Sequence, residues 1–366
     1  MRIRPTVRLG AFIAGVALIA TACGGDGADT GTNGDQGQTG AGVLQDVIDR
    51  GTLNCGVNGQ VPGFSFLDDA GNWSGFDVEY CRAIAAAVLN DPDAVDFKAL
   101  TAEQRFTALQ SKEIDVLIRN TTWTAGRDGN EGAAFATTTF YDGQGMMVRA
   151  DSEFQRLEDM QNTTICVLSG TTTELNLESQ FRGRNITYTP RSFEDNDTLR
   201  EAFVAGQCDG WTSDKSQLAG VRSTFPESEG GPEALRILDV TMSKEPLGPV
   251  VRDGDTAWFD AVNWIILATI QAEEFGITSS NVDSTAQSTG DAEIKRFLGE
   301  PAEAGAQPFD PGLGLPLDFA VRIVKAVGNY AEIYDRTVGP DTPLGLERGV
   351  NSLWTQGGLL YAPPYR

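Results

Sequence analysis

A polar loop from Arg119 to Arg127 carries several side chains that could recognise a small charged molecule. It follows an expected apolar strand and contains Asn120, Thr122 and Trp123. A guanidinium group can bind a carboxylate through two parallel N–H bonds, the strongest common charge-assisted geometry. We therefore predict that Arg127 binds a carboxylate group. A solvated surface loop without a function is the alternative that this polar composition leaves open.

A second polar segment follows another expected strand, Thr164–Leu168. It contains Thr171 and Thr172, which open a predicted helix. Backbone N–H groups at a helix start form an anion site, although threonine is also an ordinary helix cap. Further on, Asp214 ends the next predicted strand, where its carboxylate could receive an ammonium group. A cap for the helix predicted over residues 216–222 is the alternative for this residue.

These groups form a coherent set if they meet in one cleft. Arg127 would hold a carboxylate, while Asp214 and Thr172 would hold an ammonium group and a further hydrogen bond. A molecule that carries both charges close together is an α-amino acid. Each charge-assisted bond contributes about 1.5–3 kcal/mol, provided that both partners are removed from water. Closure of two lobes around the ligand would achieve this.

The composition excludes several classes of mechanism. The 366 residues include 51 Asp and Glu, 28 Lys and Arg and no histidine, and the formal net charge is −23. Without histidine there is no Ser-His-Asp or Cys-His catalysis and no His-ligated zinc. The acidic balance argues against nucleic acid and against docking on anionic lipid. No nucleotide-binding fingerprint is present, and we expect no cofactor and no metal.

The amino terminus has the features of an export signal. Three arginines precede a short apolar run, and small residues lead directly into Cys23. This pattern predicts a lipoprotein signal peptide over residues 1–22, with Cys23 lipidated. An ordinary signal that is cleaved nearby, with Cys23 incidental, is the alternative. Residues 23–44 begin with a run of small and polar residues and are predicted to be a flexible linker. The protein would then be anchored at the outer face of the cytoplasmic membrane.

Four further cysteines, Cys55, Cys81, Cys166 and Cys208, would lie in an oxidising compartment after export. Four cysteines allow three connectivities. The simplest arrangement pairs neighbours, Cys55 with Cys81 and Cys166 with Cys208. A metal site is the rival interpretation, although the chain has neither a CxxC motif nor histidine.

The order of predicted elements indicates two similar α/β units. Apolar strands alternate with helical patterns up to about Met146, and the alternation then restarts. This order favours parallel sheets with helical crossovers. In the tail, Phe319, Ile323, Val327 and Tyr330 share one face of a predicted amphipathic helix.

Several longer runs now identify a family resemblance. From about Gln45 to Arg366 the chain resembles periplasmic-type solute-binding proteins of ABC importers for polar amino acids. It is most similar to the general L-amino-acid (glutamate/glutamine/aspartate/asparagine) binding branch. The runs that carry the resemblance are 51–57 (GTLNCGV), 75–83 (GFDVEYCRA), 104–110 (QRFTALQ), 119–124 (RNTTWT), 169–174 (SGTTTE), 244–249 (KEPLGP) and 354–364 (WTQGGLLYAPP).

The resemblance implies a fold and a division of the chain. The fold is α/β, a two-lobed periplasmic-binding-protein fold of type II-like topology. Each lobe is a sheet flanked by helices, a two-stranded hinge joins the lobes, and the ligand cleft lies between them. Lobe 1 would comprise residues 45–142 and 246–366, including a C-terminal helical extension. Lobe 2, with the hinge strands, would comprise residues 143–245.

The resemblance also assigns roles to site residues. The ligand carboxylate would bind Arg127, Thr122 and the backbone near Thr172, and the ammonium group would bind Asp214 and Asn120. Phe64 lies in the loop that usually supplies an aromatic wall.

The chain departs from well-known relatives at two positions of this site. Val61 stands where many have an aromatic residue, which implies a looser side-chain pocket. Arg119 stands where many have a small residue. It would favour acidic or amide side chains if it points inward, and a salt bridge with a nearby acid is the alternative.

The function expected from this resemblance is capture of an L-amino acid by hinge closure and its delivery to a membrane permease, without catalysis. The protein would be a monomer. A sensor or receptor without transport is one alternative. A dehydratase-type enzyme on the same fold is another, and Glu174 and Glu201 are its candidate acid–base groups.

Overall fold

The computed structural model describes residues 42–366. The predicted signal peptide, Cys23 and the predicted linker as far as residue 41 lie outside this part of the chain. We predict a linker as far as residue 44, whereas helix α1 (Val43–Arg50) already begins at Val43. Val43 is buried, and its N–H donates to the Asp255 carboxylate (2.8 Å), so these residues belong to the folded part.

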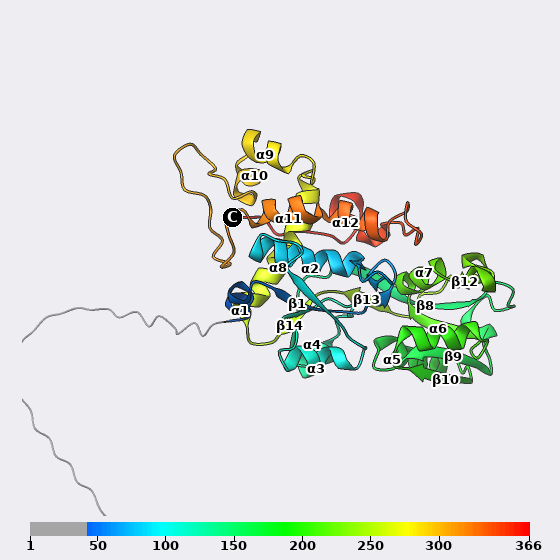
Figure 1. The fold of residues 1–366 in the computed structure, drawn as a ribbon. Helices are drawn as coiled ribbons and strands as arrows, with labels where there is room; N and C mark the ends of the chain where they lie inside the picture. The colour runs from blue at the N-terminus through cyan, green and yellow to red at the C-terminus, as the bar shows by residue number, and fades with distance from the viewer. Residues whose placement is uncertain (1–41) are drawn as a thin grey trace, which may run out of the picture. The chain divides into compact units, whose positions relative to one another are not determined.

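The first sheet has five strands in the spatial order β5-β1-β6-β14-β7. Two of them, β1 and β14, are labelled in Figure 1. β1 pairs in parallel with β5 and β6, whereas β14 is antiparallel to β6 and β7. Helical crossovers connect the parallel strands, as parallel pairing requires. The strands are β1 (Leu53–Val57), β5 (Val95–Ala99), β6 (Val116–Leu117), β7 (Ala133–Phe135) and β14 (Val250–Arg252), and the helices are α2 (Phe76–Leu89), α3 (Gln104–Gln110), α4 (Ala125–Asn130) and α8 (Thr256–Glu274). We call this sheet with its helices lobe 1.

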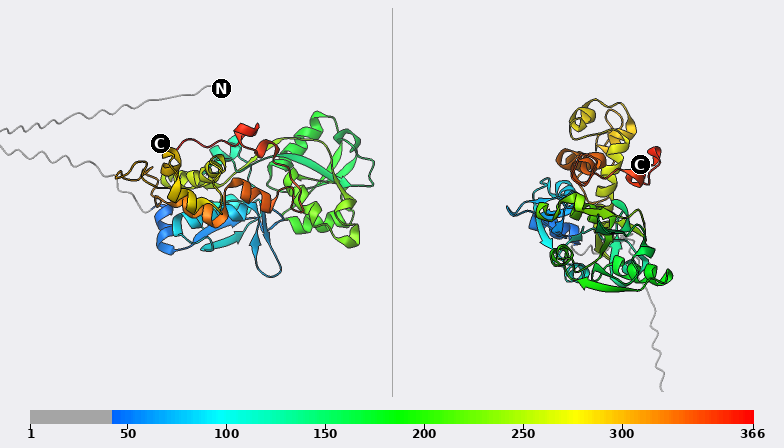
Figure 2. Two further views of the ribbon diagram at one scale, coloured as in Figure 1. Left: turned by 90° about the horizontal axis from the view of Figure 1, so that it is seen from above. Right: turned by 90° about the vertical axis from the view of Figure 1, so that its right-hand side faces the viewer.

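The second sheet repeats the arrangement, in the order β10-β9-β11-β8-β12. β9 pairs in parallel with β10 and β11, and β8 is antiparallel to β11 and β12. The strands are β8 (Phe140–Arg149), β9 (Thr163–Leu168), β10 (Tyr188–Phe193), β11 (Gly210–Asp214) and β12 (Leu235–Ile237), and the helices are α5 (Thr172–Gly183), α6 (Asn196–Val204) and α7 (Lys215–Ser223). We call this sheet with its helices lobe 2, which is green in both views of Figure 2.

Two strands connect the lobes. β8 pairs through its first four residues with β13 (Lys244–Leu247), and further along it pairs with β11 and β12 of lobe 2. The chain enters β8 from β7 of lobe 1 and leaves β13 for β14 of lobe 1. A two-stranded antiparallel ribbon therefore lies between the sheets. Short elements complete these regions: the strands β2 (Gln60–Val61), β3 (Ser65–Leu67) and β4 (Trp73–Ser74), and the 3₁₀ turns η1 (Leu157–Asp159), η2 (Glu227–Glu229) and η3 (Pro232–Ala234).

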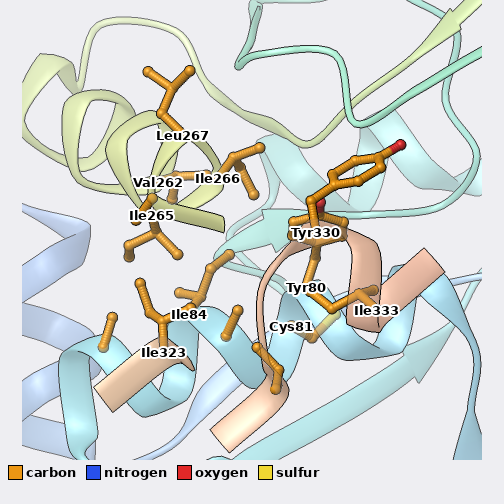
Figure 3. Close-up of a cluster of buried hydrophobic side chains, with 14 of the residues drawn as sticks. Tyr80, Cys81, Ile84, Val262, Ile265, Ile266, Leu267, Ile323, Tyr330 and Ile333 are labelled. Carbon is orange, nitrogen blue, oxygen red and sulfur yellow. The ribbon is translucent and has the colours of Figure 1, made fainter. Parts of the chain in front are cut away.

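The C-terminal region adds a layer of helices to lobe 1. Figure 3 shows the shared core, where Ile323, Tyr330 and Ile333 pack with residues of α2 and α8. The amphipathic helix predicted to run through Tyr330 is in fact two helices. It breaks at Gly328, whose φ of 78° suits glycine, and the Asn329 side chain caps the next helix. These elements are α9 (Val282–Ser288), α10 (Ala292–Phe297), α11 (Phe319–Val327), α12 (Tyr330–Thr337), η4 (Gly349–Asn351) and η5 (Trp354–Gln356).

The disulfide pairing predicted from neighbouring cysteines is present. Cys55 on β1 is bonded to Cys81 on α2, and Cys166 on β9 is bonded to Cys208 beside β11. Each bond therefore ties a strand to the next part of its own lobe. None of the helices within residues 42–366 combines the length and the apolar character that crossing a bilayer requires.

Candidate functional site

The polar loop after β6 is held in place by local hydrogen bonds. The backbone N–H of Asn120 donates to the buried carboxylate of Asp77 (2.8 Å), which lies in the first turn of α2. Thr124 caps α4 by accepting the backbone N–H of Arg127 (3.2 Å). The Arg127 guanidinium turns back to the Thr122 carbonyl (2.9 Å). The loop therefore presents Arg127 and Thr122 together, on the side that faces lobe 2.

Lobe 2 presents two helix starts to the same place. Thr171 caps α5 by accepting the N–H of Glu174 (3.1 Å), and Thr172 is the first residue of that helix. Asp214 precedes α7, but its carboxylate makes no capping bond. It accepts instead from the side chain of Asn120 in lobe 1 (3.2 Å). The alternative role of Asp214 as a side-chain cap is therefore not the one that its carboxylate performs.

The lobes meet through these residues. Besides the bond between Asn120 and Asp214, the hydroxyls of Thr122 and Thr172 lie 3.4 Å apart, and Arg105 of lobe 1 donates to the Gly170 carbonyl of lobe 2 (3.2 Å). A cavity of about 20 Å³ remains between the lobes. Its lining is Arg105, Arg119, Asn120, Thr122, Arg127, Leu168, Thr171, Thr172, Thr173, Ser213, Asp214 and Gln217. Ligand pockets usually hold a few hundred Å³, so a molecule could enter only when the lobes separate.

Burial sets the charge states of this cavity. Burial, and then the nearby carboxylates of Asp142 and Glu245, raise the pKa of Asp214 well above its ordinary value. Burial lowers the pKa of Arg127, Glu245 and Asp214 oppose this, and the group remains a cation near neutral pH. Asp214 thus lacks a full counter-charge and would gain from a cationic partner. The cavity can accept a ligand that carries an anion and a cation.

Arg105 is a cavity residue that the sequence reasoning missed. It is 2% exposed, and its Nε has no hydrogen-bond partner among the described residues. Burial lowers its pKa well below the ordinary value, and the nearby guanidinium groups of Arg127 and Arg119 act in the same direction. Leaving a buried donor without a partner costs free energy, so this group is suited to an anion that enters the cavity. A sequence signal existed, because Arg105 shares a helix face with the buried Leu109.

Two predicted ligand residues lie elsewhere. Phe64, expected to form an aromatic wall, is 1% exposed and packs against Phe76 and Phe140 in the core of lobe 1. Trp123 is 43% exposed and stacks on Phe135. Neither lines the cavity. Phe64 lies in the core because the N–H groups of Phe76 and Asp77 donate to the Gly63 and Phe64 carbonyls (2.8 and 2.9 Å) and hold this loop against the start of α2. Thr122 forms a β-bridge with Leu247 and is buried, whereas the next residue, Trp123, is exposed.

Arg119 is buried and lies in the lining of the cavity, and its Nε donates to the Leu100 carbonyl (2.7 Å). Burial lowers its pKa to about 10, while the charge of Asp77 opposes the shift. Within residues 42–366 no carboxylate forms an ion pair with it, so the salt-bridge alternative is not observed there. Its remaining N–H groups are available to a ligand or to water.

The connecting ribbon contacts the site through Glu245. This buried carboxylate accepts the hydroxyl of Thr172 (2.8 Å) and the side-chain amide of Asn176 (2.9 Å). It lies opposite Asp142 in the register of β8 and β13, and Asp142 accepts the backbone N–H of Ser216 (3.1 Å). The two carboxylates therefore hold the starts of α5 and α7 relative to the ribbon.

A larger cavity of about 750 Å³ adjoins the small one. It shares Arg127, Thr171 and Thr172 with it and extends between α3 and α4 of lobe 1 and α5 of lobe 2. Phe106 and Leu175 give it apolar walls, while several carboxylates line its rim. A ligand bound at Arg127 could continue into this space.

Comparison with known proteins places this geometry in a wider group. The sequence profile of the bacterial extracellular solute-binding proteins, family 3, matches residues 53–279. The chain is 47% identical over 324 residues to the general L-amino acid-binding periplasmic protein AapJ of Rhizobium johnstonii, a match that covers 88% of this chain and 93% of the relative. It is 45% identical over 356 residues to the glutamate/glutamine/aspartate/asparagine-binding protein BztA of Rhodobacter capsulatus, covering 97% and 99%.

A solved structure is similar over most of the chain as well. It is an ABC transporter periplasmic binding protein from Brucella ovis with glutathione bound, at 45% identity and a TM-score of 0.84. The match covers 89% of this chain and all of that one. The two-lobed α/β fold predicted from the sequence is thereby confirmed.

Proposed function

Because this chain belongs to the bacterial extracellular solute-binding proteins of family 3, we propose that it captures L-amino acids by lobe closure and delivers them to the permease of an ABC importer. The observation that carries the proposal is the meeting of Arg127 and Asp214 in one buried cavity, from opposite lobes. A ligand with both an anion and a cation satisfies the two groups together.

The backbone of the ligand would be held by four side chains. Its carboxylate would bind Arg127 and Thr122, with further N–H groups at the start of α5 around Thr171 and Thr172. Its ammonium group would bind Asp214, with the help of Asn120. The contact between Asn120 and Asp214 then serves as a stand-in that an entering ammonium group would replace.

The side chain of the ligand would meet further arginines. Arg105 and Arg119 line the same cavity, and the Nε of Arg105 is unpartnered among the described residues. This surplus of buried cations favours binding of amino acids that have an acidic or amide side chain. The four amino acids named for the relative from Rhodobacter capsulatus are of this kind. Without Phe64 or an aromatic residue at Val61 as a wall, binding across a broad range of side chains is also expected.

Closure would occur about the ribbon of β8 and β13. In this proposal lobe 1 comprises residues 45–142 and 246–366, and lobe 2 comprises residues 143–245. A ligand that touches both lobes binds the closed arrangement better and shifts the population toward it. The hydrogen bonds between Asn120 and Asp214 and between Arg105 and Gly170 are those expected of a closed arrangement.

The place of action follows from the family. An extracellular solute-binding protein is exported. We further propose that lipidation of Cys23 anchors the protein, as a monomer, at the outer face of the cytoplasmic membrane. Capture for sensing without transport is the rival. Uptake of a labelled amino acid by cells with and without the protein separates the two.

Like its relatives, the chain is a binding protein and not an enzyme. The two carboxylates considered for dehydratase chemistry have other surroundings. Glu174 accepts the N–H of Gly170 (3.1 Å) and the hydroxyl of Ser192 (2.7 Å), and Glu201 is exposed on α6. Neither lines the small cavity.

Calorimetric titration of the purified protein with a panel of L-amino acids tests the proposal. Binding of glutamate, aspartate, glutamine or asparagine is expected, and Arg127→Ala should remove it. Arg105→Met, which keeps most of the side-chain volume, should weaken glutamate more than glutamine. Failure of every L-amino acid to bind would sink the proposal. Equal losses for glutamate and glutamine would refute the role of Arg105 alone.

A second candidate ligand is a short peptide with an acidic amino acid at one end. The cavity of about 750 Å³ beside Arg127 supports it, and glutathione is bound in the relative from Brucella ovis. Titration with glutathione, in the absence and in the presence of glutamate, shows whether glutathione binds and whether it competes with glutamate for the same site.

A further inference from the structure

The first strand of the ribbon has a free edge beside its junction with lobe 1. Tyr141 of β8 lies opposite Pro246 of β13, which has no N–H to donate. The Pro246 carbonyl is taken by the backbone N–H of Trp123 (2.8 Å). The N–H and carbonyl of Tyr141 are free of β13 and need partners elsewhere, since a buried strand edge without them is unfavourable.

Asn351, near the carboxyl end of the chain, supplies both partners. Its Oδ1 accepts the N–H of Tyr141 (2.7 Å), and its Nδ2 donates to the carbonyl of the same residue (3.0 Å). The side-chain amide thus pairs with Tyr141 as a neighbouring strand would. Asn351 is 4% exposed, so water does not compete for these bonds.

The rest of this region holds Asn351 firmly. Arg348 donates through Nε to the Asn351 carbonyl (2.9 Å) and through Nη2 to the carboxylate of Glu273 on α8 (3.1 Å). Its guanidinium lies over the rings of Tyr330 (4.9 Å) and Tyr334 (5.1 Å). Such contacts fix the side chain that they surround.

A third bond secures the chain just before β8. The hydroxyl of Tyr330, the ring drawn in Figure 3, donates to the carbonyl of Thr139 (2.8 Å). Thr139 immediately precedes β8, which starts at Phe140. Two bonds from Asn351 and one from Tyr330 therefore attach the C-terminal layer to the beginning of the ribbon.

We propose that residues 348–351 brace the hinge, and that Asn351 is a positioning residue that favours the closed arrangement of the lobes. The inference rests on the proposed function. The residues concerned lie beyond residues 53–279, which the family profile matches, so that profile does not account for them. Asn351 and Tyr141 both belong to lobe 1, and in this proposal a rotation of lobe 2 would twist the ribbon from Tyr141 onward. If the bonds between Asn351 and Tyr141 are strongest when the lobes touch, they stabilise that arrangement. Asn351 itself touches no residue of the cavity.

The test uses three variants of the full protein. Asn351→Ala removes both bonds to Tyr141. Asn351→Asp keeps the acceptor for the Tyr141 N–H but sets a carboxylate against its carbonyl. Val350→Ala, at the exposed neighbouring residue, is the matched control. Glutamate Kd should rise by about three- to tenfold in Asn351→Ala, by at least as much in Asn351→Asp, and stay unchanged in Val350→Ala.

The distance between the lobes gives a readout that a merely structural role would not change. Spin labels on cysteines introduced at the exposed residues Asp69 of lobe 1 and Glu201 of lobe 2, which line a further pocket, report it. Without ligand, Asn351→Ala should shift the distance distribution toward longer values, and saturating glutamate should restore the wild-type distance.

The outcomes separate the two proposals. A folded Asn351→Ala protein with wild-type Kd and distances would overturn the brace, whereas a wild-type protein that binds no amino acid would defeat the proposed function. If Asn351→Ala does not fold, Tyr330→Phe decides. This variant removes only the bond to Thr139, and it should show the same shift in distances on a smaller scale. Wild-type distances in Tyr330→Phe would then overturn the brace.

Discussion

Replacement of Gly220 by alanine should separate closure of the lobes from stability of the fold. Gly220 lies in α7 of lobe 2, and a Cβ added there would lie 2.5 Å from the backbone oxygen of Pro62 in lobe 1. Side-chain carbons essentially never approach an oxygen this closely, and a backbone oxygen has little freedom to move. The substitution therefore opposes the arrangement in which the lobes touch, and only that arrangement.

The effects of Gly220→Ala on affinity and on stability have opposite signs. Overfilling a packed contact costs about 1–3 kcal/mol. About 1.4 kcal/mol corresponds to a tenfold change in Kd, so amino-acid affinity should fall by about 5- to 150-fold. Within the helix, alanine is more favourable than glycine by about 1 kcal/mol. When the lobes are apart, the variant should therefore be at least as stable as the wild-type protein.

Calorimetric titration with glutamate and thermal unfolding without ligand measure the two quantities. Gly183→Ala is the matched control, because Gly183 ends helix α5 of the same lobe and an added Cβ there meets nothing within 4 Å. It should leave affinity unchanged. Wild-type affinity in a folded Gly220→Ala protein would refute the reasoning, since binding would then not require α7 to approach Pro62.

Three further predictions concern the site and the fold. The affinity for amino acids should fall as the pH is lowered from neutrality, because burial raises the pKa of Asp214 where the lobes touch without a ligand and the ammonium group of the ligand binds only its carboxylate form; a pH-independent Kd, or no proton release in calorimetry with two buffers, would contradict the assignment. Arg127→Lys should weaken binding by about 10- to 100-fold while leaving the fold intact, because an ammonium group cannot make two parallel bonds to a carboxylate; wild-type affinity would reject the role of the guanidinium. Replacing both Cys166 and Cys208 with serine should lower the free energy of unfolding by about 3–4 kcal/mol in denaturant titration, because the bond closes a loop with a sequence separation of 42; unchanged stability would show that this constraint is not important.

Much of the fold was predictable because its signals are local. The alternation of strands and helices and the cap at Thr171 each depend on a few neighbouring residues. The break at Gly328 was missed for an instructive reason. The residues on either side keep one apolar face, so the hydrophobic pattern continues across two helices that pack on the same core.

The cavity residues also divide into those with a local sequence signal and those whose place depends on distant neighbours. Arg127 and Thr172 were predicted from polar segments that come after strands, at the end where ligands of α/β sheets bind, and both line the small cavity. Arg105 was missed and Phe64 was misplaced because their roles depend on which long-range neighbours surround them. Arg105 meets Gly170 across the cleft, whereas Phe64 meets Phe140 in the core.

The sequence by itself determined the chemistry available to this protein. The absence of histidine excludes several mechanisms, and the polar loops that follow strands favour binding of a zwitterion; both features can be recognised without coordinates. Only the tertiary structure decided how that chemistry is used. The raised pKa of Asp214, the unpartnered Nε of Arg105 and the attachment of Asn351 to Tyr141 arise where distant segments bury one another. Burial and hydrogen-bond partners across such distances belong to the fold as a whole, and no local pattern encodes them.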